Sequence, residues 1–513
     1  MFSNFALGFS QLSLSSYVFI LLGSITGLIF GCIPGLSGSI CLILAIPLTF
    51  SMKSVDAFAL FMGVFIGGCS GGLISAILIG VPGTASCAAT VLDGHPMARN
   101  GEPGRALGLG IFYSFFGTVL GLLVLFTVAE PLSRIALKLG AIELFSIILF
   151  ALSLVSVLAG KDLIKGWIVA LVGFNLGMVG MSSVDGVPRM IFGINKLTSG
   201  FASTAAMTGI FVVGSLFTAS VADKSNRVKR NPINYKIKGF GFTFKEFVSN
   251  IPNMIRSGVL GIFIGILPGI GGITANLLSY SVAKSFSKEP DKFGKGSMEG
   301  IVASETSNNA CIGGSMVPLL ALGIPGDGFT TLLLGALMLH DFNPGPTLFQ
   351  INGPFCYAIF AALIIAAILV VVIEYFGLPV LVQTLKIKTQ VLMPIIMVLV
   401  MVGCISIKNR IFECYILLLF AFIAYVFRKF KFSTTPVILG FILGPSAEKY
   451  LRRGLAVGNY NLNIILKSPV CMVFIALAIV LSILFLQKEK RDRKRIEKYG
   501  EDSRITEMKK NDD

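Results

Sequence analysis

The stretch G-L-I-F-G-C-I-P-G-L-S-G, from Gly27 to Gly38, decides the fold because it occurs twice. Its counterpart, G-I-F-I-G-I-L-P-G-I-G-G, runs from Gly261 to Gly272, at an offset of 234 residues. A second motif follows each copy: G-V-P-G-T from Gly80 to Thr84, and G-I-P-G-D from Gly323 to Asp327. The chain is therefore duplicated, with two Pro-Gly breaks in each half. In a bilayer, broken helices are tolerated only where protein buries them or where they line a cavity, and duplicated ones point to the substrate site of a secondary transporter.

The composition places the chain in a bilayer. Of its 513 residues, 54% are hydrophobic and 13% are charged, whereas soluble domains carry about 25% charged residues. Apolar runs recur with lengths near the ~20 residues that cross a bilayer, as in residues 355–375, 391–407, 411–427 and 470–486. We therefore predict an all-α fold, a polytopic transmembrane helical bundle with two inverted structural repeats, broken helices and re-entrant hairpins.

The positive charge follows a membrane pattern. The net charge is +16, and seven basic residues without an acid lie in Lys224–Lys245, with seven more in Lys488–Lys498. Both segments flank apolar spans, where Lys and Arg mark the cytoplasmic side and contact anionic lipid. No groove-reading motif accompanies them, so we expect no nucleic acid as a partner.

Charge placement also predicts how the repeats are related. No Lys or Arg precedes Lys53, so the N-terminus is predicted outside, and the basic segment before the second copy is predicted inside. The repeats then run in opposite directions, and a parallel repeat is the alternative. We divide the chain into transmembrane repeat 1 at 1–222, a basic cytoplasmic connector at 223–256, transmembrane repeat 2 at 257–486 and a charged cytoplasmic tail at 487–513.

The breaks predict a path within each repeat. Residues 18–50 cross once, broken at Pro34-Gly35, and residues 57–91 form a re-entrant hairpin with its tip at residues 81–83. Residues 258–283 and 299–340 mirror these two segments in the second half.

Two loops follow from this path. Arg99 and Arg105 lie inside, after a tight interfacial turn at L-D-G-H-P, residues 92–96. Lys284–Lys295, which holds four lysines, lies outside, against the charge rule.

The Pro-Gly breaks are the predicted carboxylate site. Proline costs about 3 kcal/mol inside a helix and glycine permits positive φ, so each pair splits a helix and frees backbone N–H groups at the positive end of the next half-helix. Such ends bind anions, and neighbouring hydroxyls add donors. The predicted substrate-binding residues are Pro34, Gly35, Ser37, Gly38, Ser39, Pro82, Gly83, Thr84, Pro268, Gly269, Gly271, Gly272, Thr274, Pro325 and Gly326. We interpret the surrounding glycines, such as Gly27, Gly31 and Gly265, as helix-packing positions.

A polar stretch in the second half supplies candidate cation ligands. Gly300–Gly314 reads G-I-V-A-S-E-T-S-N-N-A-C-I-G-G, and polar groups at membrane depth are costly and usually functional. The cation candidates are Ser304, Ser307, Asn308, Asn309 and Asp327. The alternatives are an interfacial segment for the stretch and an N-cap on the following helix for Asp327.

Other chemistry has little support in the sequence. Nine cysteines are scattered without a C-x-x-C pair, and His95 and His340 lie in separate halves, so no metal site is predicted. No Walker A sequence occurs, and Glu305, Asp327 and Glu374 form no spaced catalytic set. We expect no enzymatic activity and no cofactor apart from a coupling ion, H+ or Na+. An organic-anion channel and a membrane-embedded enzyme are the alternatives.

The motifs together resemble those of a known family. The paired G-x-x-x-G-x-x-P-G and G-[VI]-P-G motifs, L-D-G-H-P-M-A-R and G-R-A-L within 92–107, and L-G-I-P-G-D and L-L-L-G-A-L-M-L-H within 322–340 resemble the TctA family, the large membrane subunit of tripartite tricarboxylate transporters. The resemblance spans residues 15–485. It implies a multi-pass permease of the bacterial cytoplasmic (inner) membrane that imports tri- or dicarboxylates on a proton or sodium gradient.

The same resemblance implies partners and a site. The partners are a small membrane subunit of the TctB type, an extracytoplasmic solute-binding protein of the TctC type, the carboxylate substrate and the lipid bilayer. The family's motif residues fall on Pro34, Gly35, Gly38, Pro82, Gly83, Pro268, Gly269, Gly272, Pro325 and Gly326.

Overall fold

The computed structural model describes residues 2–158, 163–182, 184–210, 240–385, 389–408, 410–430 and 432–499. Almost all of them are helical, and this part of the chain holds one small antiparallel sheet, β1 (Gly180–Met181) with β2 (Pro188–Arg189). The predicted all-α class is therefore confirmed. The predicted connector and the predicted tail lie partly outside the described residues.

The chain forms two compact units. Unit 1 holds Met1–Lys138 and Phe201–Val426, and unit 2 holds Leu139–Gly200 and Phe427–Asp513. Each unit therefore contains segments of both predicted repeats, and unit 1 carries all four Pro-Gly breaks.

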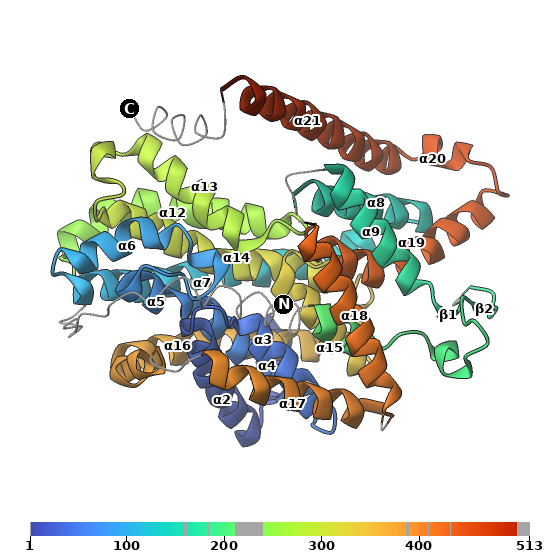
Figure 1. Ribbon diagram of the computed structural model, residues 1–513, viewed down its shortest axis with the longest axis horizontal. Coiled ribbons are helices and arrows are strands. Elements are labelled where there is room, and N and C mark those ends of the chain that lie inside the picture. Colours follow the sequence, from blue (N-terminus) through green and yellow to red (C-terminus); the bar gives the residue numbers. More distant parts are fainter. Residues whose placement is uncertain are drawn as a thin grey trace. The chain divides into compact units, whose positions relative to one another are not determined.

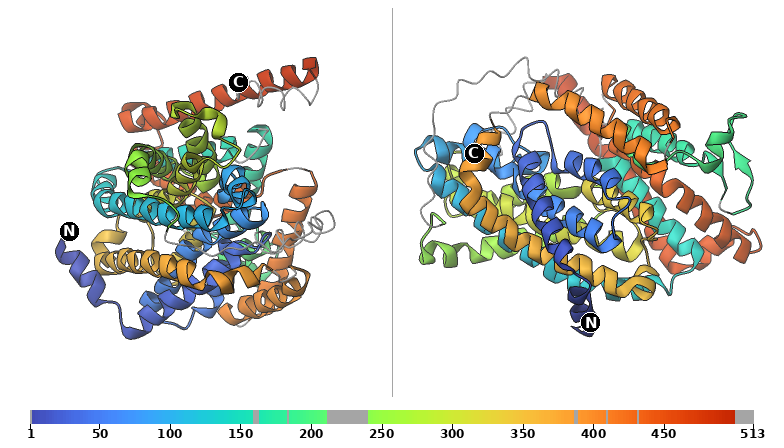
Figure 2. Two further views of the ribbon diagram at one scale, coloured as in Figure 1. Left: turned by 90° about the vertical axis from the view of Figure 1, so that its left-hand side faces the viewer. Right: turned by 90° about the horizontal axis from the view of Figure 1, so that it is seen from below.

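Five segments of the described chain, all in unit 1, are long and apolar enough to cross a bilayer. They are α2 (Leu14–Cys32), α4 (Ser54–Ser70) together with α5 (Gly72–Ile79), α7 (Pro103–Ala136), α12 (Phe244–Ile266) and α16 (Leu348–Thr384). In Figure 2, α16 runs as one long gold helix past the blue helices of the N-terminal part. The other elements of unit 1 are α1 (Phe2–Ser10), α3 (Gly38–Leu48), η1 (Ala85–Cys87), α6 (Thr90–Arg99), α10 (Ser203–Thr208), α13 (Gly271–Phe286), η4 (Pro290–Lys292), α14 (Met298–Leu322), α15 (Gly328–Leu339), α17 (Thr389–Lys408) and most of α18 (Phe412–Lys429).

The first Pro-Gly break turns the chain back. Between α2 and α3, Gly35 has φ +85°, a left-handed conformation that glycine adopts without strain. At the start of α2, the Ser16 hydroxyl donates to the Asp56 carboxylate at the start of α4 over 2.5 Å, and α3 ends shortly before α4 begins. The start of α2 and the end of α3 therefore lie together, at what we call the Asp56 end of unit 1. The prediction that residues 18–50 cross once is wrong, because they form a hairpin.

The second copy of the break makes a similar hairpin. Gly269 has φ +78° between α12 and α13. At the start of α12, Glu246 pairs with Arg105 at 2.7 Å, and beyond the end of α13 the Lys295 carbonyl accepts a hydrogen bond from Asn100 at 3.4 Å. Both ends of this hairpin thus lie at what we call the Arg105 end.

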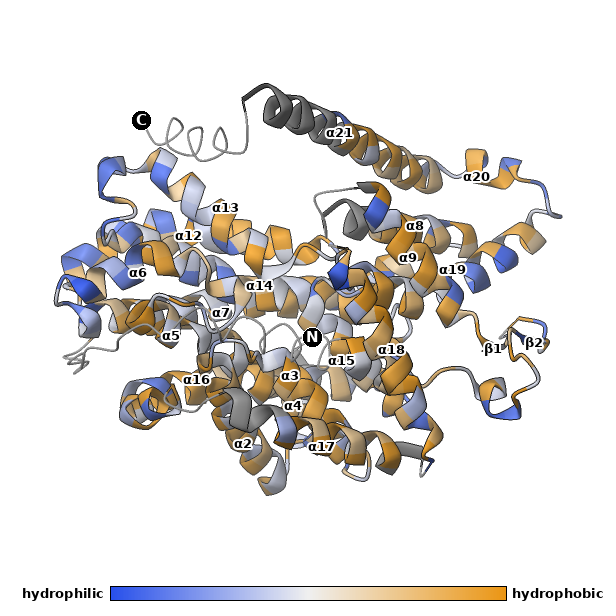
Figure 3. Ribbon diagram, in the orientation of Figure 1, coloured by the Kyte–Doolittle hydropathy of each residue, from blue (hydrophilic) through white to orange (hydrophobic). Residues whose placement is uncertain are grey.

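This arrangement corrects the predicted loop. The segment Lys284–Lys295 was expected on the opposite side from Arg99 and Arg105, but its backbone bonds place it beside them. The hairpin at Gly269 brings the chain back, so the four lysines join the other basic residues at the Arg105 end. Figure 3 shows hydrophilic residues gathered there, around α6, α12 and α13.

Long helices separate the two ends. The 34 residues of α7 begin at the Arg105 end and extend about 50 Å at 1.5 Å per residue. Near its last turns, Glu130 accepts a hydrogen bond from Tyr357 of α16. The next residue of α16, Ala358, belongs to a cluster that includes Val55, the neighbour of Asp56. The first hairpin therefore starts from one end of unit 1 and the second from the other.

The second motif of the first half follows a crossing helix. The pair α4 and α5 forms one span, so the prediction of a re-entrant hairpin over 57–91 is wrong in its first arm. After Gly80, with φ +68°, the chain folds back, and the Gly83 N–H donates to the Gly72 carbonyl over 3.3 Å. Residues 92–96, predicted as a turn, belong to helix α6, which packs on α5.

Helix α14 is the central element of unit 1. It lies against α7 on one side and α12 on the other (Figure 1). Gly117 and Gly121 of α7 bring the two backbones together, because an added Cβ would meet the carbonyl oxygens of Thr306 and Ala310. This close packing explains how a helix with so many polar residues stays inside the protein.

Unit 2 also packs its helices through close contacts at glycines. Its elements are α8 (Ala141–Leu158), α9 (Leu163–Gly177), β1, β2, η2 (Asn195–Ser199), α19 (Thr435–Val457), α20 (Asn463–Lys467) and α21 (Pro469–Tyr499). Helix α19 packs on α8 and α9, with Gly173 against the Val437 backbone. At its edge, Arg452 bonds Asp185 at 2.7 Å.

Candidate functional site

The four breaks meet in a closed ring of contacts, which we call the break ring: residues 31–38, 80–87, 265–272 and 323–327. Within the second half, the Gly269 N–H donates to the Gly326 carbonyl over 2.9 Å. Within the first half, Gly83 lies so close to Gly31 that an added Cβ would meet the Gly31 carbonyl oxygen. Each break is therefore joined to the Pro-Gly loop of its own half.

Two further contacts close the ring between the halves. An added Cβ at Gly272 would lie 3.1 Å from the Cβ of Ser86 in η1. An added Cβ at Gly38 would lie 3.0 Å from the ring of Phe329, in the first turn of α15. The structure thus brings together all four predicted segments, each half touching the other.

Equivalent glycines make equivalent contacts in the two halves. Gly83 faces the carbonyl of Gly31, and Gly326 faces the carbonyl of Gly265. Gly265 is the counterpart of Gly31 at the offset of 234 residues. Gly31 and Gly265, which we interpreted as packing positions, are so close to backbone atoms of α4 and α14 that neither has room for a side chain.

The predicted substrate residues divide by exposure. Gly35 and Thr274 are exposed, and Pro34, Ser37, Ser39, Pro82, Thr84, Gly269 and Gly272 are half-buried. Gly38, Gly83, Pro268, Gly271, Pro325 and Gly326 are buried. The Thr84 and Ser86 hydroxyls lie 3.2 Å apart on the half-buried side. The first group is within reach of a ligand, whereas the second holds the ring together.

Two of the predicted polar residues cap helices. The Ser37 hydroxyl accepts from the Ile40 N–H at the start of α3 over 3.4 Å. The Asp327 carboxylate accepts from the Thr330 N–H at the start of α15 over 2.7 Å. The N-cap interpretation of Asp327 is thus realised in the structure, and its role as a cation ligand stays a prediction.

The other cation candidates lie inside α14. Ser304, Ser307, Asn308 and Asn309 are all buried within unit 1. The Asn309 side-chain oxygen accepts from the Ser70 hydroxyl over 3.0 Å. Across the described residues, no group of three or more His, Cys, Asp or Glu side chains is placed to hold a metal ion.

Glu305 is the residue that sequence reasoning missed as a site. Its side chain is fully buried in α14, where its carboxylate accepts from Thr90 of α6 and from Ser114 of α7, the latter over 2.8 Å. The available signal was the helical spacing of Ser114 and Thr118 beside Gly117 and Gly121 in α7, which marks a polar and small stripe on an apolar helix.

The L-D-G-H-P-M-A-R motif of α6 joins the first half of the chain to the segment that precedes α14 in the second half. Asp93 of α6 accepts three backbone N–H bonds, from Gly294 at 2.8 Å, Gly296 at 2.9 Å and Ser297 at 2.8 Å. Burial raises the pKa of Asp93, against the opposite effect of these donors. Arg105, in the first turn of α7, forms ion pairs with Glu102 and Glu246.

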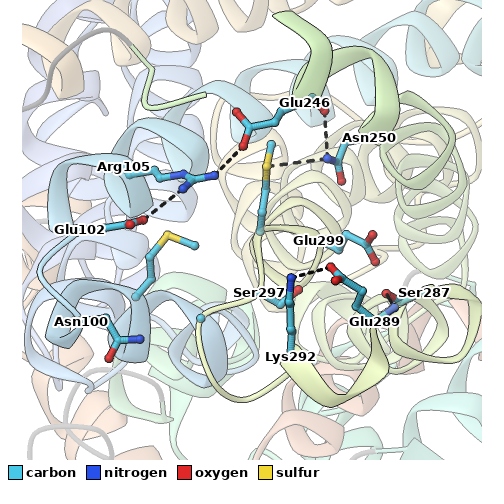
Figure 4. A pocket seen from close by; sticks show the side chains of 13 residues that line it. Asn100, Glu102, Arg105, Glu246, Asn250, Ser287, Glu289, Lys292, Ser297 and Glu299 are labelled. Carbon is cyan, nitrogen blue, oxygen red and sulfur yellow. Dashed lines mark hydrogen bonds and ion pairs between the residues drawn. The ribbon is translucent and has the colours of Figure 1, made fainter. Parts of the chain in front are cut away.

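A polar cavity of about 430 Å³ lies at the Arg105 end, away from the break ring (Figure 4). Its charged lining residues are Glu102, Arg105, Glu246, Glu289, Lys292 and Glu299. Dashed lines in Figure 4 mark the ion pairs of Arg105 and of Lys292 with glutamates. Because acids outnumber bases and both bases are paired, this cavity is poorly suited to a carboxylate.

Comparisons with known proteins agree with the membrane architecture. The family described as "Tripartite tricarboxylate transporter TctA family" matches residues 17–439. A protein of Agrobacterium vitis, described as an uncharacterized 52.8 kDa protein in the TAR-I ttuC' 3' region, is 32% identical over 96% of this chain and 98% of its own length. An uncharacterized protein in the TAR-II ttuC' 3' region of the same organism is 34% identical over 45% of this chain and 98% of its own length. No solved structure matches.

Proposed function

Because the chain belongs to the tripartite tricarboxylate transporter TctA family, we propose that it is the large permease subunit of a binding-protein-dependent secondary transporter that imports tri- or dicarboxylates on a proton or sodium gradient. The break ring carries the proposal, since four interrupted segments from the two halves contact one another in unit 1. Duplicated interrupted helices of this kind form substrate and ion sites in secondary transporters.

The ring suits an anion without basic side chains. No Lys or Arg occurs in its four segments, but α3, α13 and α15 all begin there, at Gly38, Gly271 and Gly328. Ser37 and Asp327 each take one N–H at the starts of α3 and α15. The remaining first N–H groups and the positive dipole ends favour carboxylates. The half-buried hydroxyls of Ser39 and Thr84 add hydrogen-bond donors.

The two repeats are proposed to be inverted. In support, the first hairpin starts at the Asp56 end and the second at the Arg105 end, and equivalent glycines make equivalent contacts. Alternating access then follows from movement of elements around a fixed central site. The small membrane subunit, the extracytoplasmic binding protein and the bacterial inner membrane are part of the same proposal.

Uptake by a reconstituted three-component system tests the proposal. A panel of radiolabelled carboxylates, including citrate, is presented to proteoliposomes with proton and sodium gradients imposed separately. Uptake against a concentration gradient and trans-stimulated counterflow are expected. Uptake without trans-stimulation identifies an organic-anion channel instead, and the absence of uptake with every carboxylate and either gradient overturns the transporter proposal.

A double substitution tests the site. Pro34→Ala with Gly35→Leu removes the break and places a branched side chain at φ +85°, so uptake should be lost while the protein still inserts in the membrane. Gly353→Ala in α16 is the control, because an added Cβ there meets nothing within 4 Å. Wild-type uptake by the double variant contradicts the site assignment.

A further inference from the structure

Glu305 is a buried acid without a counter-charge. Its two carboxylate oxygens are contacted by the hydroxyls of Thr90 and Ser114, and no basic side chain of the described residues bonds it. A carboxylate is strongly disfavoured in an apolar interior unless it is neutralised. An acid at such a place in a transporter therefore points to a group that takes up a cation or a proton.

The hydrogen bonds around Glu305 suit both protonation states. When the group is ionised, Thr90 and Ser114 donate to its two oxygens. When it is protonated, the acid donates to Thr90, whose own hydrogen turns to the Ser304 hydroxyl at 3.1 Å; Ser304 in turn donates to the Ile301 carbonyl over 3.1 Å. Because a hydroxyl both donates and accepts, neither state leaves an unpaired polar group.

The contacts of Glu305 favour a proton over a divalent metal cation. Cations such as Ca2+ and Mg2+ require a shell of about six or more oxygen ligands, whereas Glu305 is contacted by two hydroxyls. Gly117 and Gly121 hold α7 against the α14 backbone at Thr306 and Ala310, in the turns that follow this contact along both helices. A proton needs no additional space.

The carboxyl lies beside α6 and α13, which follow the ring segments 80–87 and 265–272. Thr90 is the first residue of α6, directly after η1. Its neighbour Ala89 donates its N–H to the Asn276 side chain of α13 over 2.7 Å, and Asn276 donates to the Ser304 carbonyl over 3.0 Å. A change in the Thr90 bond therefore acts on the arms that carry the ring.

Several other ionisable side chains lie on the helices that pack around Glu305. Glu374 of α16 is buried and close enough to interact electrostatically with Glu305. The thiols of Cys69 in α4 and Cys87 in η1 also interact electrostatically with Glu305. Buried ionisable groups on the surrounding elements also include Asp93 of α6, Tyr113 of α7 and Tyr280 of α13, and Asp327 lies just before α15. Arg256 of α12 is engaged by Asn253 and the Phe286 ring. None of these groups supplies a positive charge to Glu305.

We propose that Glu305 binds the coupling proton of this transporter, and that the proton changes the bond between α14 and the first residue of α6. The inference rests on the proposed function and names the ion and the residue within it. A proton taken from the side of higher proton concentration neutralises Glu305 for transport and is released on the other side.

Glu305→Gln tests the coupling. Proteoliposomes holding the complete transporter are assayed with radiolabelled citrate for counterflow and for accumulation driven by a pH gradient. The variant should keep counterflow and lose accumulation, because the amide mimics the protonated acid but releases no proton. Glu305→Asp should keep part of the accumulation, and Glu299→Gln, in the same helix, should behave as wild type. Accumulation by Glu305→Gln at the wild-type level overturns the proposal, as does wild-type accumulation that follows only a sodium gradient.

Infrared difference spectroscopy of the protein in lipid provides a second measurement that needs no substrate. A band of a protonated, buried carboxylic acid should appear on lowering the pH, shift in Glu305→Asp and vanish in Glu305→Gln. If wild type transports no carboxylate, the proposed function fails while this band still decides the protonation of Glu305. A spectrum that is the same in wild type and both variants overturns the assignment.

Discussion

Gly326→Ala is the substitution whose effect can be worked out most directly from the structure. An added Cβ would meet the Gly265 carbonyl oxygen and lie 2.7 Å from the Ser315 Cα. Both are backbone atoms of packed helices, which cannot rotate aside as a side chain does. Forcing a methyl group into such a contact costs about 1–3 kcal/mol. The Gly269 to Gly326 hydrogen bond of 2.9 Å is also weakened, so we expect a loss of about 2–4 kcal/mol of stability.

Gly328→Ala is the matched control. It lies two residues away, where an added Cβ meets nothing within 4 Å, and neither glycine has a positive φ. Alanine reduces the freedom of the unfolded chain by a similar amount in both variants, worth about 0.4–1 kcal/mol. The difference between the two variants therefore isolates the steric effect at Gly326.

Thermal unfolding in detergent, followed with a thiol-reactive dye, measures this difference. Cys87 and Cys311 are buried near the break ring, so they react only when unit 1 opens. Gly326→Ala should unfold at a clearly lower temperature than Gly328→Ala and wild type. Equal unfolding temperatures for the two variants would refute the close contact between the loop and α12.

Three further predictions follow from individual contacts. Asp327→Ala should lower stability by about 1 kcal/mol in the same assay through loss of the N-cap, whereas Asp327→Asn keeps the cap; loss of uptake in the stable Asn variant supports a cation role, and normal uptake contradicts it. Hydrogen bonds from Ser182 and Arg452 lower the pKa of Asp185. The ionised Asp185 should therefore make the protein more stable than Asp185→Asn above the usual Asp pKa of about 3.9, and this difference in stability should be lost as the pH falls below it. A difference in stability that does not change with pH contradicts the pairing. Cysteines at Phe240, which packs on Gly108 near the Arg105 end, and at Gly345 should label from opposite sides of the membrane. Gly345 lies three residues after Phe342, whose ring packs on Phe58 near the Asp56 end. Labelling from one side contradicts the arrangement of the ends.

The sequence predicts the breaks well because their causes are local. A proline followed by a glycine interrupts a helix whatever its surroundings, and Gly35 and Gly269 indeed take the left-handed conformation that other residues resist. The repetition of the motifs also predicts that the segments act together, and the ring of contacts agrees with this. What the motif does not contain is the direction in which the chain leaves the break.

That direction depends on packing between distant segments. An apolar run of 19 residues in α2 is long enough to cross a bilayer, so hydropathy cannot distinguish half of a broken span from the first arm of a hairpin. The choice is made by contacts such as Gly38 on the Gly68 backbone, which holds α3 against α4. These partners are about 30 residues apart, and their proximity follows only from the fold.

The positive-inside rule already indicated an error in the predicted path of the second half. Four lysines in Lys284–Lys295 on an outside loop contradict the positive-inside rule, and the contradiction disappears once α13 returns to the end where α12 starts. When the chain also turns back at the first break, α4 and α5 together become the crossing span of the first half. A misplaced basic loop therefore carries information about chain direction that apolar length lacks, because the cost of moving charge across a bilayer applies to the whole path and not to one helix.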